Sequence, residues 1–369
     1  MQRDAWAQVN LNAVEYNLRL IKSWLNPKTK LMTVVKSDAY GHGASGLSQV
    51  LAESGADYFG VASVDEGCQL RQTGIKKPIL ILSPCPGWAL KTAIENNLEL
   101  TITSALQLDE LKEYLTRFKQ TATIHIKVDT GMHRLGIQPN KCLDLILKAA
   151  EHKQIRVQGL FSHLAMADDQ ETSFAQNKIF TEVINQVKKA KLAPPLLHLA
   201  SGEAARRFPE LHYDMVRIGL YIYGLEPRTK SADLKPAMSV RARINQIQTL
   251  PANEGVGYGH TWESPMESRL ASIPIGYADG IDRRLSNNMI GLLHGKPINQ
   301  VGRISMDQML FDISKVSQAQ EGDVITLIGN DENKRLDLSA WAQELDTITY
   351  ELACRLRARL PRIYTRENL

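Results

Sequence analysis

The chain has 369 residues, which is enough for roughly two domains that each bury a core of their own. Hydrophobic residues make up 43% and charged residues 23%, as in an ordinary soluble globular protein, and a net charge of only +4 without a long basic stripe disfavours a nucleic-acid-binding protein. The four cysteines form no C-x-x-C pair and have no regular spacing, which disfavours a disulfide framework and a metal site of the structural zinc type.

The N-terminal residues lack the apolar core of a signal peptide. No run in the sequence approaches the ~18 consecutive apolar residues of a membrane-spanning helix. We therefore expect a cytoplasmic protein that contacts neither a membrane nor a nucleic acid.

The first predicted elements are a helix and a buried strand that stops at a lysine. Apolar residues recur at helical spacing over residues 8–25, with Asn12 as a candidate cap. An apolar, partly β-branched stretch over 31–35 then ends at Lys36, and a glycine-containing turn leads into another helical segment. Lysine is rarely fully buried without a partner. Lys36 therefore either extends its ammonium group into solvent, which the local pattern favours, or is placed for chemistry.

Short apolar strands then alternate with helical segments as far as residue 224. The further predicted strands are 58–62, 79–82, 98–102, 123–128, 156–161, 196–199 and 215–218, and the clearest helices are 63–73, 106–118, 140–152 and 174–192. This alternation is typical of parallel βαβ units. Eight strands in the first 230 residues match an α/β fold of the (β/α)8 TIM-type barrel class. A doubly wound open sheet remains an alternative, because the pattern does not reveal whether the sheet closes.

The pattern changes after Gly224. Residues 226–236 carry two prolines and several charges without an apolar period, which is typical of a linker. Short alternating stretches separated by Gly, Pro and Asn follow, and they predict a mostly β domain that ends in helices at 338–345 and 350–359. We therefore expect a barrel domain over 1–230 and a mostly β domain over 231–369.

Charged or polar side chains lie at the ends of several predicted barrel strands. Lys36 ends the first strand, Lys127 lies at the end of the fifth, His163 closes the sixth and Arg217 lies at the end of the eighth. The carboxyl ends of the strands form the active site in barrels of this type. Each residue also has an ordinary explanation: His163 as a core histidine, Arg217 in a surface ion pair, and Lys127 paired with Asp129.

Small residues occupy the positions where such barrels often bind phosphate, after strands seven and eight. Ser201, Gly202 and Gly219 allow backbone N–H groups to approach an anion. A lysine and a phosphate niche at one end of a barrel indicate a phosphorylated carbonyl ligand held as a Schiff base. Pyridoxal 5'-phosphate is the leading candidate.

Six sequence strings carry a resemblance to a known family. They are V-V-K-S-D-A-Y-G-H-G, I-K-V-D-T-G-M-H-R-L-G, F-S-H-L-A-M-A-D, M-V-R-I-G-L-Y-I-Y-G, I-G-Y-A-D-G and V-G-R-I-S-M-D. In this order they resemble the motifs of alanine racemases, which are pyridoxal-phosphate-dependent enzymes of fold type III, and the similarity extends over about residues 4–364. The resemblance implies a (β/α)8 barrel followed by a mostly β domain, in a homodimer with two active sites at its interface.

The implied activity is the interconversion of L-alanine and D-alanine by two-base transfer of the α-proton, which supplies D-alanine for peptidoglycan in the cell wall. Lys36 matches the residue that holds the cofactor and acts as one catalytic base. Tyr277 matches the second base and is contributed by the other subunit. Arg217 matches the residue that hydrogen-bonds the pyridine nitrogen, with His163 beside it. The residues that match the phosphate-binding positions are Tyr40, Ser201, Gly202, Gly219, Leu220 and Tyr350.

Three further residues match the substrate side of the family's site. Arg134 and the main chain of Met306 match the groups near the substrate carboxylate. Lys127 matches a lysine that is carbamylated in many members, where its negative charge orients the arginine at position 134.

The chain departs from the family pattern at three places. Ser201-Gly202 stands where many members have Asn-Ser or Ala-Ser, Ile218 replaces a proline, and Ser305 stands where some members have cysteine. None of these changes removes a base or the Schiff-base lysine.

The sequence is also compatible with other functions. A racemase for serine or for a broader set of amino acids differs only in pocket volume, which discriminates weakly between substrates. An amino-acid decarboxylase of the same fold type and a non-catalytic pyridoxal-phosphate-binding protein are further alternatives. Decarboxylases of this type generally place an acid at the pyridine nitrogen and lack the tyrosine of the G-Y-A-D-G motif, here Tyr277. The mostly β domain and Tyr277 argue against the non-catalytic protein.

Overall fold

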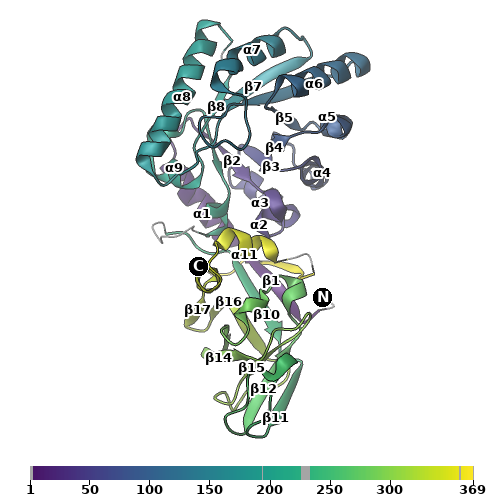
Figure 1. The fold of residues 1–369 in the computed structure, drawn as a ribbon, viewed down its shortest axis with the longest axis vertical. Helices are drawn as coiled ribbons and strands as arrows, with labels where there is room; N and C mark the ends of the chain where they lie inside the picture. The colour runs from purple at the N-terminus through teal and green to yellow at the C-terminus, as the bar shows by residue number, and fades with distance from the viewer. Residues whose placement is uncertain (1–2, 193, 226–232, 357–358, 369) are drawn as a thin grey trace. The chain divides into compact units, whose positions relative to one another are not determined.

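The computed structural model describes residues 3–192, 194–225, 233–356 and 359–368, which form two compact units (Figure 1). The barrel unit comprises residues 15–39 and 44–222, and the sheet unit comprises residues up to 14, residues 40–43 and those from 223 onward. The short segment 40–43 thus belongs to the sheet unit although barrel residues flank it on both sides. Part of the predicted linker and the predicted domain boundary, at 226–232, lies outside the described residues.

Eight parallel strands form a closed barrel in the barrel unit. Neighbouring strands follow the order β8-β7-β6-β5-β4-β3-β2-β9. The ring closes between β8 and β9, where the Asp214 N–H donates to the Leu197 carbonyl (3.0 Å) and the Arg217 N–H to the Ala200 carbonyl (3.1 Å). The barrel prediction is confirmed and the open-sheet alternative is wrong. The strands are β2 (Lys30–Val34), β3 (Tyr58–Val61), β4 (Ile79–Pro84), β5 (Glu99–Ile102), β6 (Ala122–Lys127), β7 (Ile155–Phe161), β8 (Leu196–His198) and β9 (Met215–Ile218).

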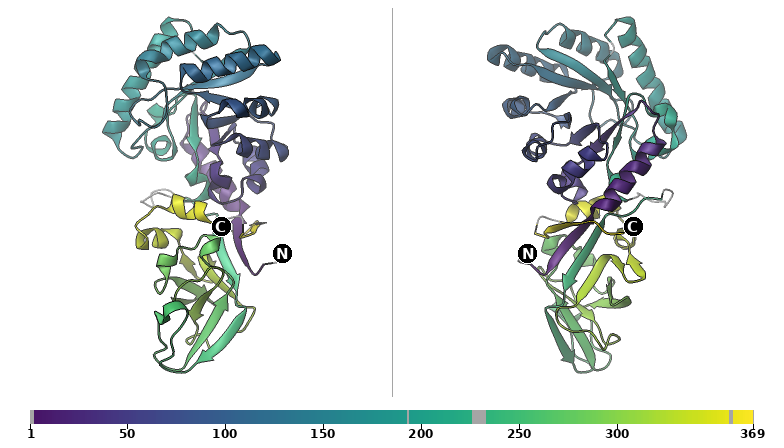
Figure 2. Two further views of the ribbon diagram at one scale, coloured as in Figure 1. Left: turned by 45° about the vertical axis from the view of Figure 1, so that its right-hand side comes forward. Right: turned by 180° about the vertical axis from the view of Figure 1, so that it is seen from behind.

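Helices alternate with these strands and lie outside the ring (Figures 1 and 2). Serine and aspartate side chains cap three of them: Ser63, Ser104 and Asp169 accept hydrogen bonds from N–H groups three residues on. Inside, apolar side chains from five strands pack together and explain why the strands read as continuous apolar runs. The helices are α1 (Leu11–Trp24), α3 (Ala44–Glu53), α4 (Val64–Gln72), α5 (Leu90–Glu95), α6 (Ala105–Phe118), α7 (Pro139–Ala150), α8 (Gln170–Lys189) and α9 (Gly202–Arg207).

The sheet unit contains a sheet of ten strands, as the mostly β pattern predicted. Its main path follows the order β11-β12-β15-β14-β13-β16-β10-β1-β18, and β17 pairs with β16. The strands are β1 (Ala5–Asn10), β10 (Met238–Arg243), β11 (Gln246–Leu250), β12 (Ser268–Ile273), β13 (Ile290–Leu293), β14 (Lys296–Val301), β15 (Met309–Asp312), β16 (Val324–Asp331), β17 (Lys334–Leu336) and β18 (Arg362–Thr365), and the helices are α10 (Leu338–Glu344) and α11 (Thr349–Arg355). Short 3-10 helices include η3 (Leu220–Tyr223), η4 (Tyr258–His260), η5 (Tyr277–Asp279) and η6 (Arg283–Leu285).

One predicted element begins in the wrong place. The helix expected over residues 8–25 starts only at Leu11, because residues 5–10 form strand β1. This strand pairs with β10 and β18, which lie more than 200 residues further along the chain. Long-range pairing therefore overrides the local helical spacing. Among the described residues, no helix combines the length and the apolar character needed to cross a bilayer.

Candidate active site

Four cationic side chains of the barrel unit lie near the carboxyl ends of its strands. Lys127 ends β6, and burial lowers the pKa of its ammonium group to about 8, with Arg217, Arg134 and Lys36 adding to the effect. The side chains of Lys36, Lys127 and Arg134 make no hydrogen bond or ion pair to any residue that the structure describes. The predicted alternative of a Lys127–Asp129 ion pair is not formed, because Oδ1 of Asp129 accepts N–H groups of its own loop at 3.0–3.1 Å. This excess of positive charge suits an anionic ligand.

Lys36 lies at the start of an unusual turn rather than at the end of the strand. Strand β2 ends at Val34, and Ser37, Asp38, Ala39 and Tyr40 all have φ between +52° and +54°. A left-handed conformation costs non-glycine residues roughly 1–2 kcal/mol each. Specific hydrogen bonds hold this turn: the Ser37 N–H donates to Glu66 Oε1 (2.7 Å), and the Ala44 N–H donates to Asp38 Oδ1 (2.7 Å).

Arg217 is buried within the barrel, with 4% of its surface exposed. Its Nη2 donates to the carbonyls of Ser162 (2.7 Å) and Leu199 (3.0 Å) and lies 3.1 Å from Nδ1 of His163. None of its hydrogen bonds to described residues uses Nε, which leaves that donor for a ligand. Burial lowers the pKa of Arg217 to about 9, so it stays protonated at neutral pH. The alternative prediction, that Arg217 pairs with a carboxylate at the surface, is therefore wrong.

His163 accepts a hydrogen bond from this guanidinium. Burial, followed by the charges of Arg217 and Lys127, holds the pKa of His163 well below its usual value. The ring is thus neutral, and its Nδ1 can accept from Arg217.

Sequence reasoning missed three polar residues beneath this site. Nη1 of Arg217 lies 3.0 Å from Nδ1 of His198, and Nε2 of His198 lies 2.9 Å from Nδ1 of His125. Nε2 of His125 lies 2.8 Å from Oε2 of Glu99. All three residues are buried. The available signal was an ionisable side chain in each of three short, buried strands: Glu99 in β5, His125 in β6 and His198 in β8.

The predicted phosphate residues of the barrel unit lie beside the end of β9. Ser201 forms a parallel bridge with Arg217. Helix α9 begins at Gly202, and η3 begins at Leu220 directly after Gly219. The first N–H groups of a helix have no partner within it and suit an anion. An amine on Lys36, these N–H groups and the free donor of Arg217 together fit pyridoxal 5'-phosphate.

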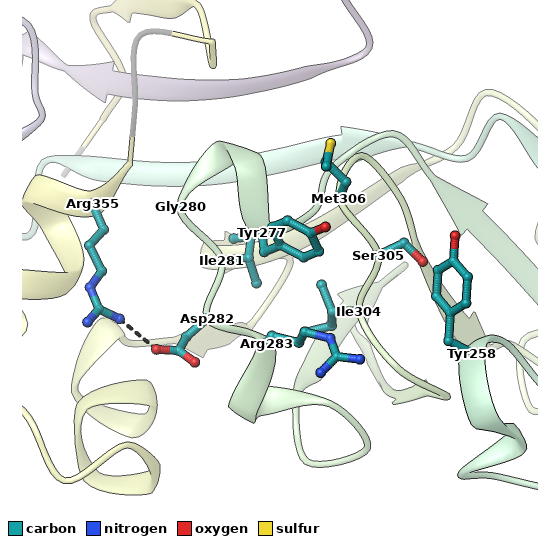
Figure 3. A pocket seen from close by; sticks show the side chains of 10 residues that line it. All are labelled: Tyr258, Tyr277, Gly280, Ile281, Asp282, Arg283, Ile304, Ser305, Met306 and Arg355. Carbon is teal, nitrogen blue, oxygen red and sulfur yellow. Dashed lines mark hydrogen bonds and ion pairs between the residues drawn. The ribbon is translucent and has the colours of Figure 1, made fainter.

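Tyr277 and Met306 line one pocket of about 930 Å³ in the sheet unit (Figure 3). The Tyr277 N–H donates to the Ser305 carbonyl (3.0 Å), and the Ala278 N–H donates to the Met306 carbonyl (3.1 Å). A Cβ on Gly276 would overlap the Ser305 carbonyl oxygen, so only glycine lets the two loops approach this closely. The side chains of Tyr277 and Met306 are 41% and 52% exposed. The Tyr277 hydroxyl makes no hydrogen bond to a described residue.

Tyr40 and Tyr350 also lie together in the sheet unit. Their ring centroids are 6.3 Å apart at an interplanar angle of 65°. Arg362 holds the backbone next to Tyr40, because its Nε and Nη2 donate to the Gly41 carbonyl at 3.0 and 2.8 Å. The structure thus groups the predicted residues by unit: Lys36, Lys127, Arg134, His163, Arg217 and the Ser201–Gly202 and Gly219–Leu220 backbone in the barrel unit, and Tyr40, Tyr277, Met306 and Tyr350 in the sheet unit.

Comparison with known proteins covers almost the whole chain. The family model described as "Alanine racemase, N-terminal domain" matches residues 9–227, and that described as "Alanine racemase, C-terminal domain" matches residues 237–364. The chain is 40% identical to the alanine racemase of Synechocystis sp., over 98% of this chain and 99% of that protein. Among solved structures, alanine racemase of Clostridium difficile matches with a TM-score of 0.94 and 32% identity, covering 100% of this chain and 97% of that one. A histidine racemase from Leuconostoc mesenteroides matches with a TM-score of 0.92 and 26% identity, covering 99% and 98%.

Proposed function

The chain belongs to the alanine racemase family of pyridoxal-phosphate-dependent isomerases, and we propose that it interconverts L-alanine and D-alanine. The observation that carries this proposal is the cluster of Lys36, Lys127, Arg134 and Arg217 at the carboxyl ends of the barrel strands. These cations have no carboxylate partner among the described residues. In the proposed roles, Lys36 holds the cofactor, Arg217 faces its ring nitrogen and Arg134 suits the substrate carboxylate.

Racemisation needs one base on each face of the substrate's α-carbon. Pyridoxal phosphate, when bound to Lys36, supplies the electron-withdrawing ring that makes the α-hydrogen acidic. Lys36 removes or returns the proton on one face, and Tyr277 of the partner subunit does so on the other. Two bases on opposite faces invert the configuration without any change in the side chain.

The remaining predicted residues bind and orient. Arg217 donates a hydrogen bond to the ring nitrogen from a guanidinium that stays protonated, so it holds the ring without transferring a proton. The backbone at Ser201–Gly202 and Gly219–Leu220, with Tyr40 and Tyr350, binds the phosphate. Arg134 and the Met306 main chain bind the substrate carboxylate.

We further propose that the chain acts as a cytoplasmic homodimer and supplies D-alanine for peptidoglycan. Support for the dimer comes from Tyr277, whose hydroxyl has no hydrogen-bond partner among the described residues and faces a pocket that Met306 also lines. Each active site would then combine Lys36 of one subunit with Tyr277 of the partner subunit.

A change of optical rotation with L-alanine tests the proposed activity directly. Purified protein loaded with pyridoxal phosphate should bring L-alanine and D-alanine to the same zero rotation. The similarity to a histidine racemase makes a broader substrate range the second candidate, so serine and histidine belong in the same assay. Loss of rotation with serine or histidine, and not with alanine, would replace the proposed substrate. Release of CO2 would instead indicate a decarboxylase.

We predict that CO2 carbamylates the Lys127 amine. Only a neutral amine reacts with CO2, and with a pKa of about 8 roughly a tenth of Lys127 is neutral at pH 7, compared with about 0.04% for an ordinary lysine. At fixed total carbonate, a protein-bound carbamate signal in the ¹³C NMR spectrum should grow from pH 6.5 to about 8 and then level off. The signal should be absent in Lys127→Met and retained in Lys77→Met, since Lys77 donates to the Ala56 carbonyl. An unchanged signal in Lys127→Met would contradict the assignment.

A further inference from the structure

We propose that Glu99, His125 and His198 form a positioning relay that holds the Arg217 guanidinium through the barrel core. The relay crosses four strands, from Arg217 on β9 through β8 and β6 to Glu99 on β5. The assignment of the ring nitrogen as the ligand of Arg217 rests on the proposed function. The hydrogen-bond order within the relay does not.

The chemistry of its two ends determines the direction of every hydrogen bond. Arginine has only donors, so Nδ1 of His198 must accept from Nη1 of Arg217. Nε2 of His198 then carries the proton and donates to Nδ1 of His125. Nε2 of His125 in turn donates to the Glu99 carboxylate, which only accepts. Both histidines are therefore neutral and carry their proton on Nε2.

Extra protons do not fit this arrangement. A proton on Nδ1 of His198 would face the arginine donor, and a proton on Nδ1 of His125 would face the His198 donor. Burial, followed by the charge of Arg217, also holds the pKa of His198 well below its usual value. The hydrogen bonds of the relay thus hold each of the two histidines in a single neutral tautomer.

Neighbouring residues shape the space that the two rings occupy. Gly159 on β7 lies beside His125, and a Cβ there would overlap the imidazole ring. Phe161 on the same strand stacks on His198, with centroids 4.6 Å apart and an interplanar angle of 5°. Both rings are fully buried. Strand β7 therefore fixes the two imidazole rings: Gly159 leaves space for His125, and the ring of Phe161 packs against His198.

Glu99 is the only carboxylate in this hydrogen-bond network among the described residues. A buried guanidinium is costly without a compensating charge. The two neutral imidazoles connect Arg217 to that charge while keeping the carboxylate out of direct contact with it. Arg217 thereby keeps its Nε donor available and its orientation fixed. Glu99 is thus a positioning residue that acts on the cofactor through Arg217.

The first test needs no variant. Long-range ¹H–¹⁵N NMR of the cofactor-loaded protein, which has only nine histidines, reports the tautomer of each imidazole. We expect His125 and His198 to carry their proton on Nε2, before any substrate is added. A proton on Nδ1 of His198, or a doubly protonated ring at either position, would overturn the relay.

The second test removes the charge of Glu99 and keeps its shape. In Glu99→Gln the amide can donate as well as accept, so it no longer dictates the tautomer of His125. We expect a fraction of His125 to move its proton to Nδ1, a shifted absorption band of the bound cofactor, and a kcat reduced by about tenfold or more with little change in KM. Asp214→Asn is the matched control, because Asp214 accepts from the Leu197 N–H beside His198 but lies outside the relay.

The outcomes separate this inference from the proposed function. If Glu99→Gln leaves the His125 tautomer, the cofactor spectrum and kcat as in the Asp214→Asn control, the positioning role is wrong. If the tautomers are as expected but the wild-type protein racemises nothing, the proposed function fails and the hydrogen-bond order of the relay stands. Should Glu99→Gln not fold, a wrong tautomer of either histidine in the wild-type protein would still overturn the relay.

Discussion

Replacing Lys36 with alanine should abolish racemisation, with a loss of at least about 10³-fold. The substitution removes both the amine that holds the cofactor and the base on one face of the substrate. The visible absorption of the bound cofactor should therefore disappear together with the activity. Absorption spectroscopy and polarimetry on the same preparation measure the two losses.

Lys30→Ala is the matched control for this prediction. Lys30 is the first residue of strand β2, at the end opposite to Lys36, and is exposed. Its replacement should leave activity and spectrum unchanged. Substantial racemisation by Lys36→Ala, with the cofactor still bound, would show that another residue fills both roles.

Tyr277→Phe should lower racemisation by about 10²–10⁴-fold, because it removes the base on the second face. Cofactor binding and its absorption should persist, since Lys36 is intact. Tyr258→Phe is the control: this tyrosine lines the same pocket and is 69% exposed, and its change should have little effect (Figure 3). Equal losses of activity in the two variants would contradict the assignment of Tyr277 as the second base.

Mixing the two inactive variants tests whether Tyr277 acts across the dimer. In a mixed dimer of Lys36→Ala and Tyr277→Phe, one site combines the intact lysine of one subunit with the intact tyrosine of the other. Random exchange makes half of the dimers mixed, with one active site of two, so about a quarter of the wild-type activity should return. Verified mixed dimers without activity would mean that both bases come from one chain.

The barrel could be predicted from the sequence because its strands are buried on both faces. Such strands appear as short apolar runs between helical segments, and the predicted strands agree with the observed ones to within about two residues. Strand β1 could not be predicted in the same way. Its partners β10 and β18 lie at the other end of the chain, and no local period reveals that pairing.

The candidate site was predicted only where its residues follow strands or lie in motifs. Lys36, His163 and Arg217 stand at such positions. Glu99, His125 and His198 lie inside strands, and a single polar residue there gives no sign of its partner. Their hydrogen bonds join residues 26 and 73 positions apart. Only the closed barrel brings them together. The left-handed turn after Lys36 escaped prediction as well, because Ser, Ala and Tyr do not favour that conformation.

Proton NMR of L-alanine in D2O, with the purified and pyridoxal-phosphate-loaded protein, tests the two-base account most directly. The α-proton signal should disappear while the optical rotation of the same sample decays to zero, since each face exchanges its proton with a different base. Loss of the α-proton with the rotation retained would mean that only one base works and that Tyr277 is not the second. Retention of both would contradict the proposed function itself.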